Sequence, residues 1–216
     1  TIIAANSLQS ALGTDFGISK SPGFMQGPVF ITQVTAPGGE FFNFADCGDY
    51  NPGHMAVILS WFAAETGSKM FYKSETLQHP ESLGRMAGPG LVWASRCKAD
   101  NTATLSNEWF GDGKNPVAVF RDPDNNFYLA MKGGKANLSH GNMDAGTFIF
   151  ELNGIRWIID PGNQPYYPLN RIGFNLAGHC QDCPRWTLLT KSNMGHSTIT
   201  INHERFDVDA TAHIID

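Results

Sequence analysis

The sequence predicts a mainly β protein with a small α portion, in which an antiparallel β-sandwich follows a few helices. Three observations predict this class. The 216 residues include 23 glycines and 12 prolines, which suits a fold with many turns. From about residue 115 onward, short β-prone runs follow one another at regular spacing. Asn153-Gly154 separates two such runs, and both residues tolerate the positive φ that a type I′ hairpin turn requires.

Helices are expected in the first third of the chain. Residues 1–12 have a helix-compatible apolar pattern, and Gly13 can end that helix as a C-cap. Residues 54–65 form the clearest helical segment, which ends before Gly67. A second short helix is predicted over residues 69–77.

Two other segments organise this part of the chain. Residues 29–34 and 40–44 are β-prone and predict a hairpin. Residues 80–90 contain glycine and proline and predict a linker. We therefore expect a helical portion with its linker over residues 1–85 and a β-sandwich over residues 86–216.

The predicted sandwich begins with two strands, residues 117–121 and 126–132, joined by an Asp-Pro-Asp-Asn turn. The central hairpin follows, with strands over residues 146–152 and 155–159. These runs predict consecutive antiparallel strands.

The rest of the chain is expected to combine loop and strand. Residues 163–184 form a long segment with prolines and tyrosines, which is a candidate binding loop. Residues 196–202 alternate Ser or Thr with Ile, and this pattern predicts a half-buried strand. Residues 205–209 predict another strand.

Charge and hydropathy limit the function. The formal net charge of −5 argues against a nucleic-acid partner, which needs a basic face, and a polyanionic substrate would need a locally basic site. No apolar run approaches the ~20 residues of a membrane span, so we expect no membrane insertion. Thr1 is not a natural start, which leaves an upstream signal or domain open.

The four cysteines are Cys47, Cys97, Cys180 and Cys183. The Cys-Gln-Asp-Cys motif after His179 could be a metal clip or a redox pair. A single Cys-x-x-Cys is weak evidence for zinc, so a surface loop with free or locally bridged cysteines is the simpler interpretation.

Polar residues gather at the ends of the central hairpin. His140, Asn142 and Asp144 precede it in a glycine-flanked loop, and Asp160 follows it. Because a hairpin places its first residue opposite its last, we expect this loop and Asp160 to lie close together. Such a cluster on a rigid platform suits a functional site.

Three segments resemble one family. Residues 139–162, SHGNMDAGTFIFELNGIRWIIDPG, are similar to the signature region of heparinase II/III-like polysaccharide lyases, where a His-Gly-His-x-Asp-Ala-Gly-Ser-Phe type loop precedes such a hairpin. Arg185-Trp186 with residues 195–202 resembles the family's Arg-Trp…Gly-His-Asn-Thr-Leu-x-Ile-Asn segment, and residues 42–48 resemble a linking stretch. The resemblance implies a supersandwich-like β domain after the remnant of a truncated α/α toroid.

The resemblance also implies an enzyme, a carbon–oxygen lyase that cleaves a uronic-acid polysaccharide by β-elimination. The proton α to the carboxylate is removed once that carboxylate is neutralised, and the 4-oxygen leaves. His140 matches the family's first loop histidine, which acts in proton transfer or charge neutralisation. Asn142 could be a neutralising amide, and Tyr166 a phenolic acid or base.

Other residues are candidates for substrate contact. Lys132 and Lys135 could meet an anion at the mouth of the loop, Tyr167 could stack on a sugar, and Arg185 could bind a carboxylate in a bidentate manner.

A zinc site is a further implication of the family pattern. The positions that hold metal in the family are Asn142, Asp160 and His196 here. Asn142 stands where the family has histidine, and an amide is a poor zinc ligand, so zinc is expected to be absent, weaker or replaced by a harder ion. The alternative is that Asp160 and His196 hydrogen-bond each other.

The resemblance suggests a periplasmic or secreted bacterial protein whose partner is an acidic polysaccharide, and a homodimer is one oligomeric state considered. The family's toroid tyrosine is missing from these 216 residues, so we expect the isolated chain to cleave little or nothing. The rival hypothesis is a non-catalytic carbohydrate-binding or structural sandwich. A weaker one is a glycoside hydrolase with Asp144 and Asp160 as paired carboxylates.

Overall fold

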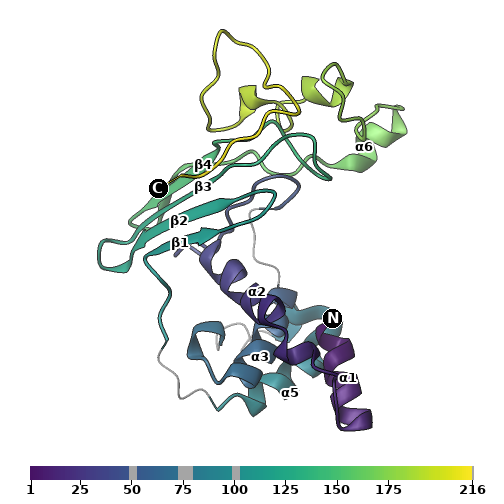
Figure 1. Ribbon diagram of the computed structural model, residues 1–216, viewed down its shortest axis with the longest axis vertical. Helices are drawn as coiled ribbons and strands as arrows, with labels where there is room; N and C mark the ends of the chain where they lie inside the picture. The colour runs from purple at the N-terminus through teal and green to yellow at the C-terminus, as the bar shows by residue number, and fades with distance from the viewer. Residues whose placement is uncertain (49–52, 73–79, 99–102, 216) are drawn as a thin grey trace. The chain divides into compact units, whose positions relative to one another are not determined.

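The computed structural model describes residues 1–48, 53–72, 80–98 and 103–215, and the chain divides into two compact units (Figure 1). Unit 1 comprises Thr1–Gln33 and Asn51–Leu105 and is helical. Unit 2 comprises Val34–Tyr50 and Ser106–Asp216 and contains the sheet. The division after Leu105 differs from the predicted one after residue 85, and the segment that starts at Val34 belongs with the sheet.

Unit 1 is built from α-helices and short 3-10 helices. The α-helices are α1 (Ile2–Leu12), α2 (Pro22–Gln33), α3 (Gly53–Thr66) and α5 (Ala87–Arg96). The 3-10 helices are η1 (Ile18–Lys20), η2 (Lys69–Phe71) and η3 (Pro80–Met86). The predicted helices over residues 1–12 and 54–65 are confirmed as α1 and α3, and Gly13 ends α1 at φ 74°. Residues 73–77 of the predicted short helix lie outside the described residues.

The core of unit 1 forms around α3. Trp61 and Phe62 are almost completely buried, and Phe24 of α2 packs on both rings, with centroids 5.8 and 5.3 Å away. Trp93 of α5 joins the same cluster. Burying these aromatic side chains supplies most of the apolar contact that holds the helices together. No helix in the described part of the chain is long and apolar enough to cross a membrane.

Two predictions for this region are wrong. Residues 29–34 are not a strand, because all but Val34 belong to α2, where Val29 and Ile31 pack on the helical core. Tertiary packing here overrides the β propensity of the apolar run. Residues 80–90 are not an extended linker but form η3 and the first turn of α5.

Unit 2 contains a five-stranded antiparallel sheet in the order β1-β2-β3-β4-β5, so every strand pairs with its sequence neighbour. The strands are β1 (Glu108–Gly111), β2 (Val117–Asp122), β3 (Phe127–Lys132), β4 (Phe148–Leu152) and β5 (Ile155–Ile158). The turn η4 (Pro123–Asn125) joins β2 to β3, as predicted. Asn153 and Gly154 join β4 to β5 at φ 53° and 75°, which confirms the type of turn expected.

One face of the sheet is buried along its three central strands, β2, β3 and β4. Val119 of β2, Tyr128 of β3 and Ile149 of β4 have 0% exposure. They pack with Val34 and Phe42, which belong to the first segment of unit 2, Val34–Tyr50. This packing brings residues 42–46, distant in sequence, beside the sheet. The placement of that segment determines the functional site.

Beyond β5 the chain forms loops and short helices, drawn green to yellow in Figure 1. The helices are α6 (Tyr166–Arg171), η5 (Pro184–Thr187) and η6 (Asn193–Gly195). Residues 196–202 and 205–209 are loops, so the strands predicted there are wrong. The described residues therefore form one antiparallel sheet with a small helical portion, and a second sheet facing it is not found among them.

The loop at residues 196–202 has a physical cause. The Ser197 hydroxyl accepts from the Phe148 amide at 3.1 Å and donates to the Phe148 carbonyl, while Thr198 donates to the Ala145 carbonyl at 2.7 Å. Side-chain hydroxyls thus occupy backbone groups that a strand ladder would use. This segment docks through its side chains instead of through a ladder.

Candidate functional site

The site centres on Asp46, whose carboxylate accepts hydrogen bonds from three side chains. Its Oδ2 lies 2.7 Å from His140 Nδ1 and also accepts the Tyr166 hydroxyl. Its Oδ1 accepts Lys191 Nζ. The three donors come from the loop before β4, from the start of α6 and from the turn before η6. Four segments of unit 2 therefore converge on one carboxylate.

The loop before β4 fixes Asp46 through its neighbour Ala45. We call residues 138–144 the His140 loop. Asn142 Nδ2 donates to the Ala45 carbonyl at 3.2 Å, and the Ala45 amide donates to Asp144 Oδ2 at 3.4 Å. The loop thus bonds both the amide and the carbonyl of Ala45, and this places the next residue, Asp46, beside His140.

His140 is the most accessible member of the cluster, with 67% of its side chain exposed. Its backbone is left-handed at φ 60°, next to Gly141, where an added Cβ would lie 2.5 Å from the Ala136 carbonyl. Because a carboxylate accepts, the Nδ1 of a neutral imidazole carries the proton, and Nε2 keeps a free lone pair. The Asp46 contact therefore prepares Nε2 to take a proton from a ligand.

Tyr166, the first residue of α6, is 39% exposed. Partial burial raises the pKa of its hydroxyl to about 12, and the hydrogen bond to Asp46 and the Asp46 charge act in the same direction. The phenol is therefore protonated at neutral pH, which suits a proton donor.

Asp46 is held ionised. Burial opposes its charge, but hydrogen bonds from Lys191, Tyr166 and His140 outweigh burial and lower its pKa below the ordinary value of 3.8. The Lys191 side chain is fully buried, and its ammonium lies 5.9 Å from the centroid of the Tyr166 ring. Asp46 and Lys191 thus form an ion pair that contacts the two accessible side chains, His140 and Tyr166.

Arg185 supports the His140 loop from below. It is 2% exposed, and its two terminal nitrogens bond Gly141 O at 2.8 Å and His179 Nε2 at 2.7 Å. Burial and the Arg185 charge lower the pKa of His179. Arg185 was predicted to contact substrate, but the structure commits its terminal nitrogens to protein acceptors and makes it a brace.

Asp160 and His196, two of the predicted metal ligands, form a separate buried pair. His196 Nδ1 lies 2.9 Å from Asp160 Oδ2, which also accepts the Thr147 hydroxyl at 3.0 Å, and Asp160 Oδ1 accepts the Gly162 amide at 2.8 Å. Both Asp160 oxygens are thus engaged by protein donors. The hydrogen-bonded alternative describes this geometry.

The third predicted ligand, Asn142, is completely buried, and its Oδ1 and His196 Nε2 have no hydrogen-bond partner in the described structure. No group of three His, Cys, Asp or Glu side chains that could hold a metal occurs in the described residues. With one imidazole, an engaged carboxylate and an amide, these residues fit zinc poorly. Zinc stays a prediction, and no chemical step is derived through it.

The remaining candidates lie outside the cluster. Lys132 is 3% exposed and pairs with Asp144 at 2.5 Å, so it is placed in the interior and not at the mouth of the loop. Lys135 is half-buried and lines a hollow with residues 211–214. Tyr167 is 73% exposed beside Tyr166, in reach of a ligand. Asn142, buried against Ala45, does not face a ligand either.

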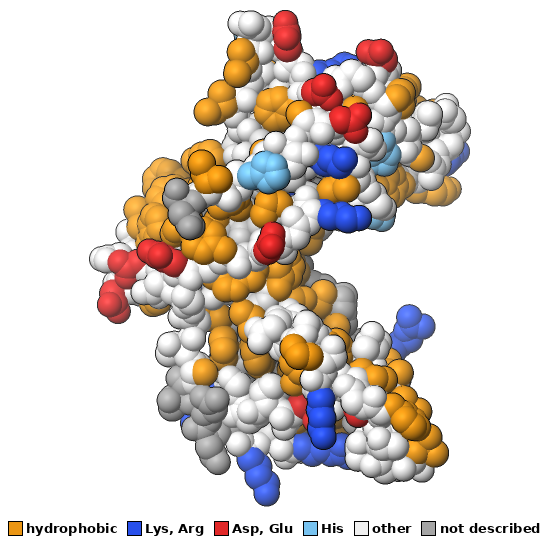
Figure 2. Space-filling model, viewed as in Figure 1, with side chains coloured by type: hydrophobic (Ala, Val, Ile, Leu, Met, Phe, Trp, Pro, Cys, Tyr) orange, Lys and Arg blue, Asp and Glu red, His pale blue; other side chains and the backbone are white. Residues whose placement is uncertain are grey.

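Two central residues, Asp46 and Lys191, were missed by sequence reasoning. Asp46 lies inside the Phe42–Gly48 segment that carries the third family resemblance, so a sharper reading of that segment could have found it. Lys191 carries no motif. Figure 2 shows histidine side chains beside lysine or arginine side chains on one face of unit 2.

Unit 2 is thus a β domain with a five-stranded antiparallel sheet and an Asp-His-Tyr cluster. Residues 116–210 match the family described as "Heparinase II/III-like, C-terminal", and this part of the chain is a heparinase II/III-like C-terminal region. For these residues the predicted family resemblance is thereby confirmed. The match includes His140, Tyr166 and Lys191 but not Asp46. A comparison with curated proteins finds no match.

Proposed function

We propose that this protein acts on an acidic, uronic-acid-containing polysaccharide and that the Asp46 cluster cleaves it by β-elimination. The observation that carries the proposal is the shared carboxylate: Asp46 Oδ2 accepts from both His140 and Tyr166, a candidate base and a candidate acid. The membership of residues 116–210 in a polysaccharide lyase family supports the same class of chemistry.

His140 is the proposed base. Its Nε2 takes the proton α to the sugar carboxylate, the C–H electrons form the new double bond, and the bond to the 4-oxygen breaks. Asp46 stabilises the imidazolium that results, because its charge lies against Nδ1. The geometry gives His140 both an accessible lone pair and an anionic partner.

Tyr166 is the proposed acid. Its phenol is protonated at neutral pH and can give its proton to the departing 4-oxygen. Lys191 lies near the phenol ring, and its positive charge favours the phenolate left behind. His140 Nε2 and the Tyr166 phenol are both accessible, so the imidazolium loses its Nε2 proton to water and the phenolate regains a proton from water, which restores the starting states.

The charge of the cluster favours an anionic sugar. Lys191 pairs with Asp46, and Lys132 pairs with the neighbouring Asp144. Buried Arg185 therefore adds a positive charge near the cluster, although the whole chain carries −5. A uronic-acid polymer lies outside the cytoplasm of its degrader, which is the basis for proposing a periplasmic or secreted protein.

The test is ultraviolet absorbance of unsaturated product from a panel of uronic-acid polymers, with protein in excess so that slow turnover is visible. Since little cleavage is expected of the isolated chain, we expect slow product formation from at least one polymer, and a fall of roughly 10²–10⁴-fold in His140→Ala and Tyr166→Phe. Tyr72→Phe in unit 1 is the matched control. Absence of both cleavage and binding across the panel would overturn the proposal.

A non-catalytic carbohydrate-binding domain is the second candidate. It is favoured by the commitment of Arg185, Lys191 and Asn142 to protein contacts, which leaves mainly His140 and the two α6 tyrosines accessible. Binding of a polymer without unsaturated product, measured by calorimetry on the same panel, would select this function. Paired-carboxylate hydrolysis has little support, because Asp144 and Asp160 are both buried and engaged by Lys132 and His196.

A further inference from the structure

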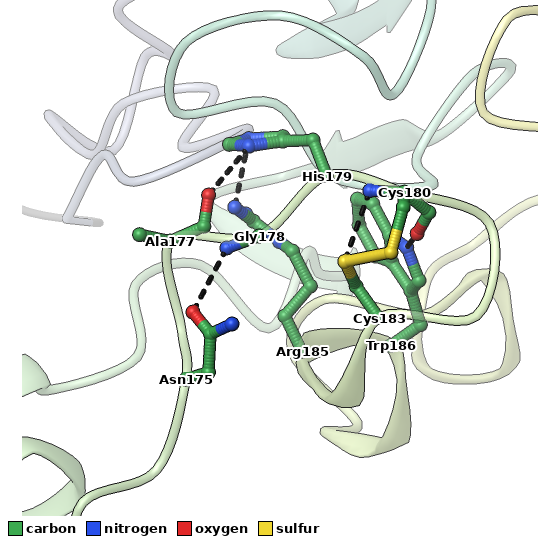
Figure 3. Close-up of a disulfide and its surroundings, with 8 residues drawn as sticks. All are labelled: Asn175, Ala177, Gly178, His179, Cys180, Cys183, Arg185 and Trp186. Carbon is green, nitrogen blue, oxygen red and sulfur yellow. Dashed lines mark hydrogen bonds between the residues drawn. A yellow bond between two sulfur atoms is a disulfide. The ribbon is translucent and has the colours of Figure 1, made fainter.

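A disulfide lies next to the segment that carries Arg185, the residue that hydrogen-bonds the His140 loop. It joins Cys180 and Cys183, three positions apart, with their Cα atoms 5.1 Å from each other. Cys180 is exposed, whereas Cys183 is buried and belongs to a cluster with Trp186 and Met143. Figure 3 shows the bridge beside Trp186. One half of the bridge is therefore open to a reagent, and the other half is part of the core.

The bridge contributes little to the stability of the whole fold. A disulfide stabilises a fold mainly by restricting the unfolded chain, and this effect grows with the length of the closed loop. The loop closed here spans a separation of three residues. A local role explains the bridge better than the stability of the whole unit.

Locally, the bridge orders the turn that leads into η5. The Cys180 amide donates to Cys183 Sγ at 3.0 Å, and Trp186 Nε1 donates to the Cys180 carbonyl at 2.8 Å. A Cβ on Gly178 would lie 2.6 Å from Cys183 Sγ, so the sulfur packs tightly on the preceding backbone. A change at the sulfur atoms has no free space on this side.

The same turn positions Arg185. The guanidinium stacks over the Trp186 ring, 4.7 Å from its centroid, and bonds His179, the residue before Cys180, at 2.7 Å. The other terminal nitrogen bonds the Gly141 carbonyl in the His140 loop at 2.8 Å. Residues on both sides of the bridge thus hold the arginine that holds the loop, as Figure 3 shows for His179, Arg185 and Trp186.

We propose that Cys180–Cys183 is a redox-active disulfide, open to a dithiol reductant, and that its reduction releases the His140 loop through Arg185. The redox activity of the disulfide does not depend on the proposed function. Its regulatory meaning rests on the proposed function of the His140 loop.

The reaction is thiol–disulfide exchange. A thiolate of the dithiol attacks the sulfur of exposed Cys180, the S–S bond breaks, and Cys183 leaves as a thiolate that takes up a proton. The second thiol of the reductant displaces Cys180, so two electrons pass to the protein and the dithiol becomes a disulfide. A second dithiol protein or a small dithiol could each supply these electrons.

Reduction replaces a bonded sulfur pair by two thiols that need van der Waals separation. Cys183 is confined by the core and by Gly178, so exposed Cys180 is the half that moves, together with His179 beside it. Arg185 then loses the acceptor on His179 that helps to orient it. We expect the Gly141 carbonyl to lose its fixed partner as a result.

The first experiment treats the folded protein with dithiothreitol, alkylates the thiols and locates them by mass spectrometry. We expect Cys180 and Cys183 to become alkylated at reductant concentrations that leave the fold intact by circular dichroism. A bridge that opens only when the protein unfolds would overturn the proposal. Cys47 and Cys97, which lie outside the Cys180–Cys183 bridge, serve as internal references.

The second experiment measures amide hydrogen exchange in the His140 loop before and after reduction. The Gly141 amide, which donates to Leu138 O at 2.9 Å, is expected to exchange about tenfold faster in the reduced protein. Cys180→Ser should reproduce this without reductant, and Cys97→Ser in unit 1 should not. In Arg185→Gln, reduction should have no further effect, because the same link is already broken.

The outcomes separate the two proposals. Unchanged exchange after complete reduction overturns the coupling, whatever the protein does to polysaccharides. Faster exchange with a fall in polymer cleavage or binding supports the switch. Faster exchange in a protein that neither binds nor cleaves any uronic-acid polymer retains the redox site and rejects the proposed function instead.

Discussion

Asp46 and His140 are 94 positions apart in the chain, yet Asp46 Oδ2 lies 2.7 Å from His140 Nδ1. The same oxygen accepts the Tyr166 hydroxyl, so one carboxylate orients two accessible groups with opposite tasks. Lys191 keeps that carboxylate ionised. The proposed function of the site therefore depends on Asp46 as the residue that positions His140 and Tyr166, and the first two predictions concern it.

Asp46→Asn should lower the pKa of Tyr166 from about 12. Burial is the largest cause of the raised value and remains in the variant, but the hydrogen bond to a carboxylate and the carboxylate charge are lost. Ultraviolet titration of tyrosinate, with Tyr166→Phe to assign the signal, measures the shift. The exposed Asp124 in the turn after β2 provides the control Asp124→Asn, which should leave Tyr166 unchanged. An unshifted Tyr166 in Asp46→Asn would contradict the contact.

Asp46 should also contribute a pH-dependent part of the stability. Its pKa is lowered in the folded protein, so its stabilisation is present above the ordinary value of 3.8 and is lost as pH falls through the folded value. Urea unfolding should therefore show a difference between wild type and Asp46→Asn that is full at pH 7 and shrinks in acid. A difference that grew on acidification would have the wrong sign for this mechanism.

Lys132 and Asp144 should act as a structural pair and not as ligands for substrate. Their side chains are 2% and 1% exposed, so Lys132→Met leaves a buried carboxylate unpaired and should cost about 3–5 kcal/mol of unfolding free energy. Lys132→Met combined with Asp144→Leu should cost less than the sum of the two single variants. Denaturant unfolding checks the cycle, with the half-buried Lys135→Met as a control expected within about 0.5 kcal/mol.

The central hairpin could be predicted because its signal is local. Asn153-Gly154 carries its turn geometry in two residues, and the loop from His140 to Asp144 is read from glycines and family motif alike. Strands at residues 196–202 could not be excluded, because the alternation of Ser or Thr with Ile is the same whether hydroxyls face water or bond the backbone of β4. The partner of Ser197 is the backbone of Phe148, and only the tertiary fold brings the two together.

Asp46 was missed for the same reason: its contacts form only in the tertiary structure. The Phe42–Gly48 segment resembles the family, but the pattern does not single out Asp46, because its donors come from residues 140, 166 and 191 and meet it only after Phe42 has packed on the sheet. Lys132 was misjudged for a related reason. Its place at the end of β3 suggested the loop mouth, whereas the alternation of β3 turns its side chain inward to Asp144.

Zinc binding tests the separate Asp160–His196 pair. Because both Asp160 oxygens accept protein hydrogen bonds and Asn142 replaces an imidazole donor, we expect dialysed wild-type protein to hold well under one equivalent of zinc. Asn142→His should raise the bound zinc toward one equivalent, by supplying a second imidazole. Elemental analysis after dialysis decides. Stoichiometric zinc in the wild type that is lost in Asp160→Ala would instead support the metal site implied by the family.

Gly141→Ala should displace the His140 loop. An added Cβ would lie 2.5 Å from the Ala136 carbonyl and 3.0 Å from the Leu138 carbonyl, and both are backbone atoms that cannot rotate away. The backbone must therefore shift, which should cost about 1–3 kcal/mol and pull the Gly141 carbonyl from Arg185. Thermal unfolding measures the first effect, and the Tyr166 pKa and polymer cleavage report the second. Gly23→Ala in α2, where an added Cβ meets nothing within 4 Å, is the matched control. If Gly141→Ala is as stable and as active as wild type, the loop is not held against Arg185 and Asp46 as described, and the proposed catalytic arrangement loses its support.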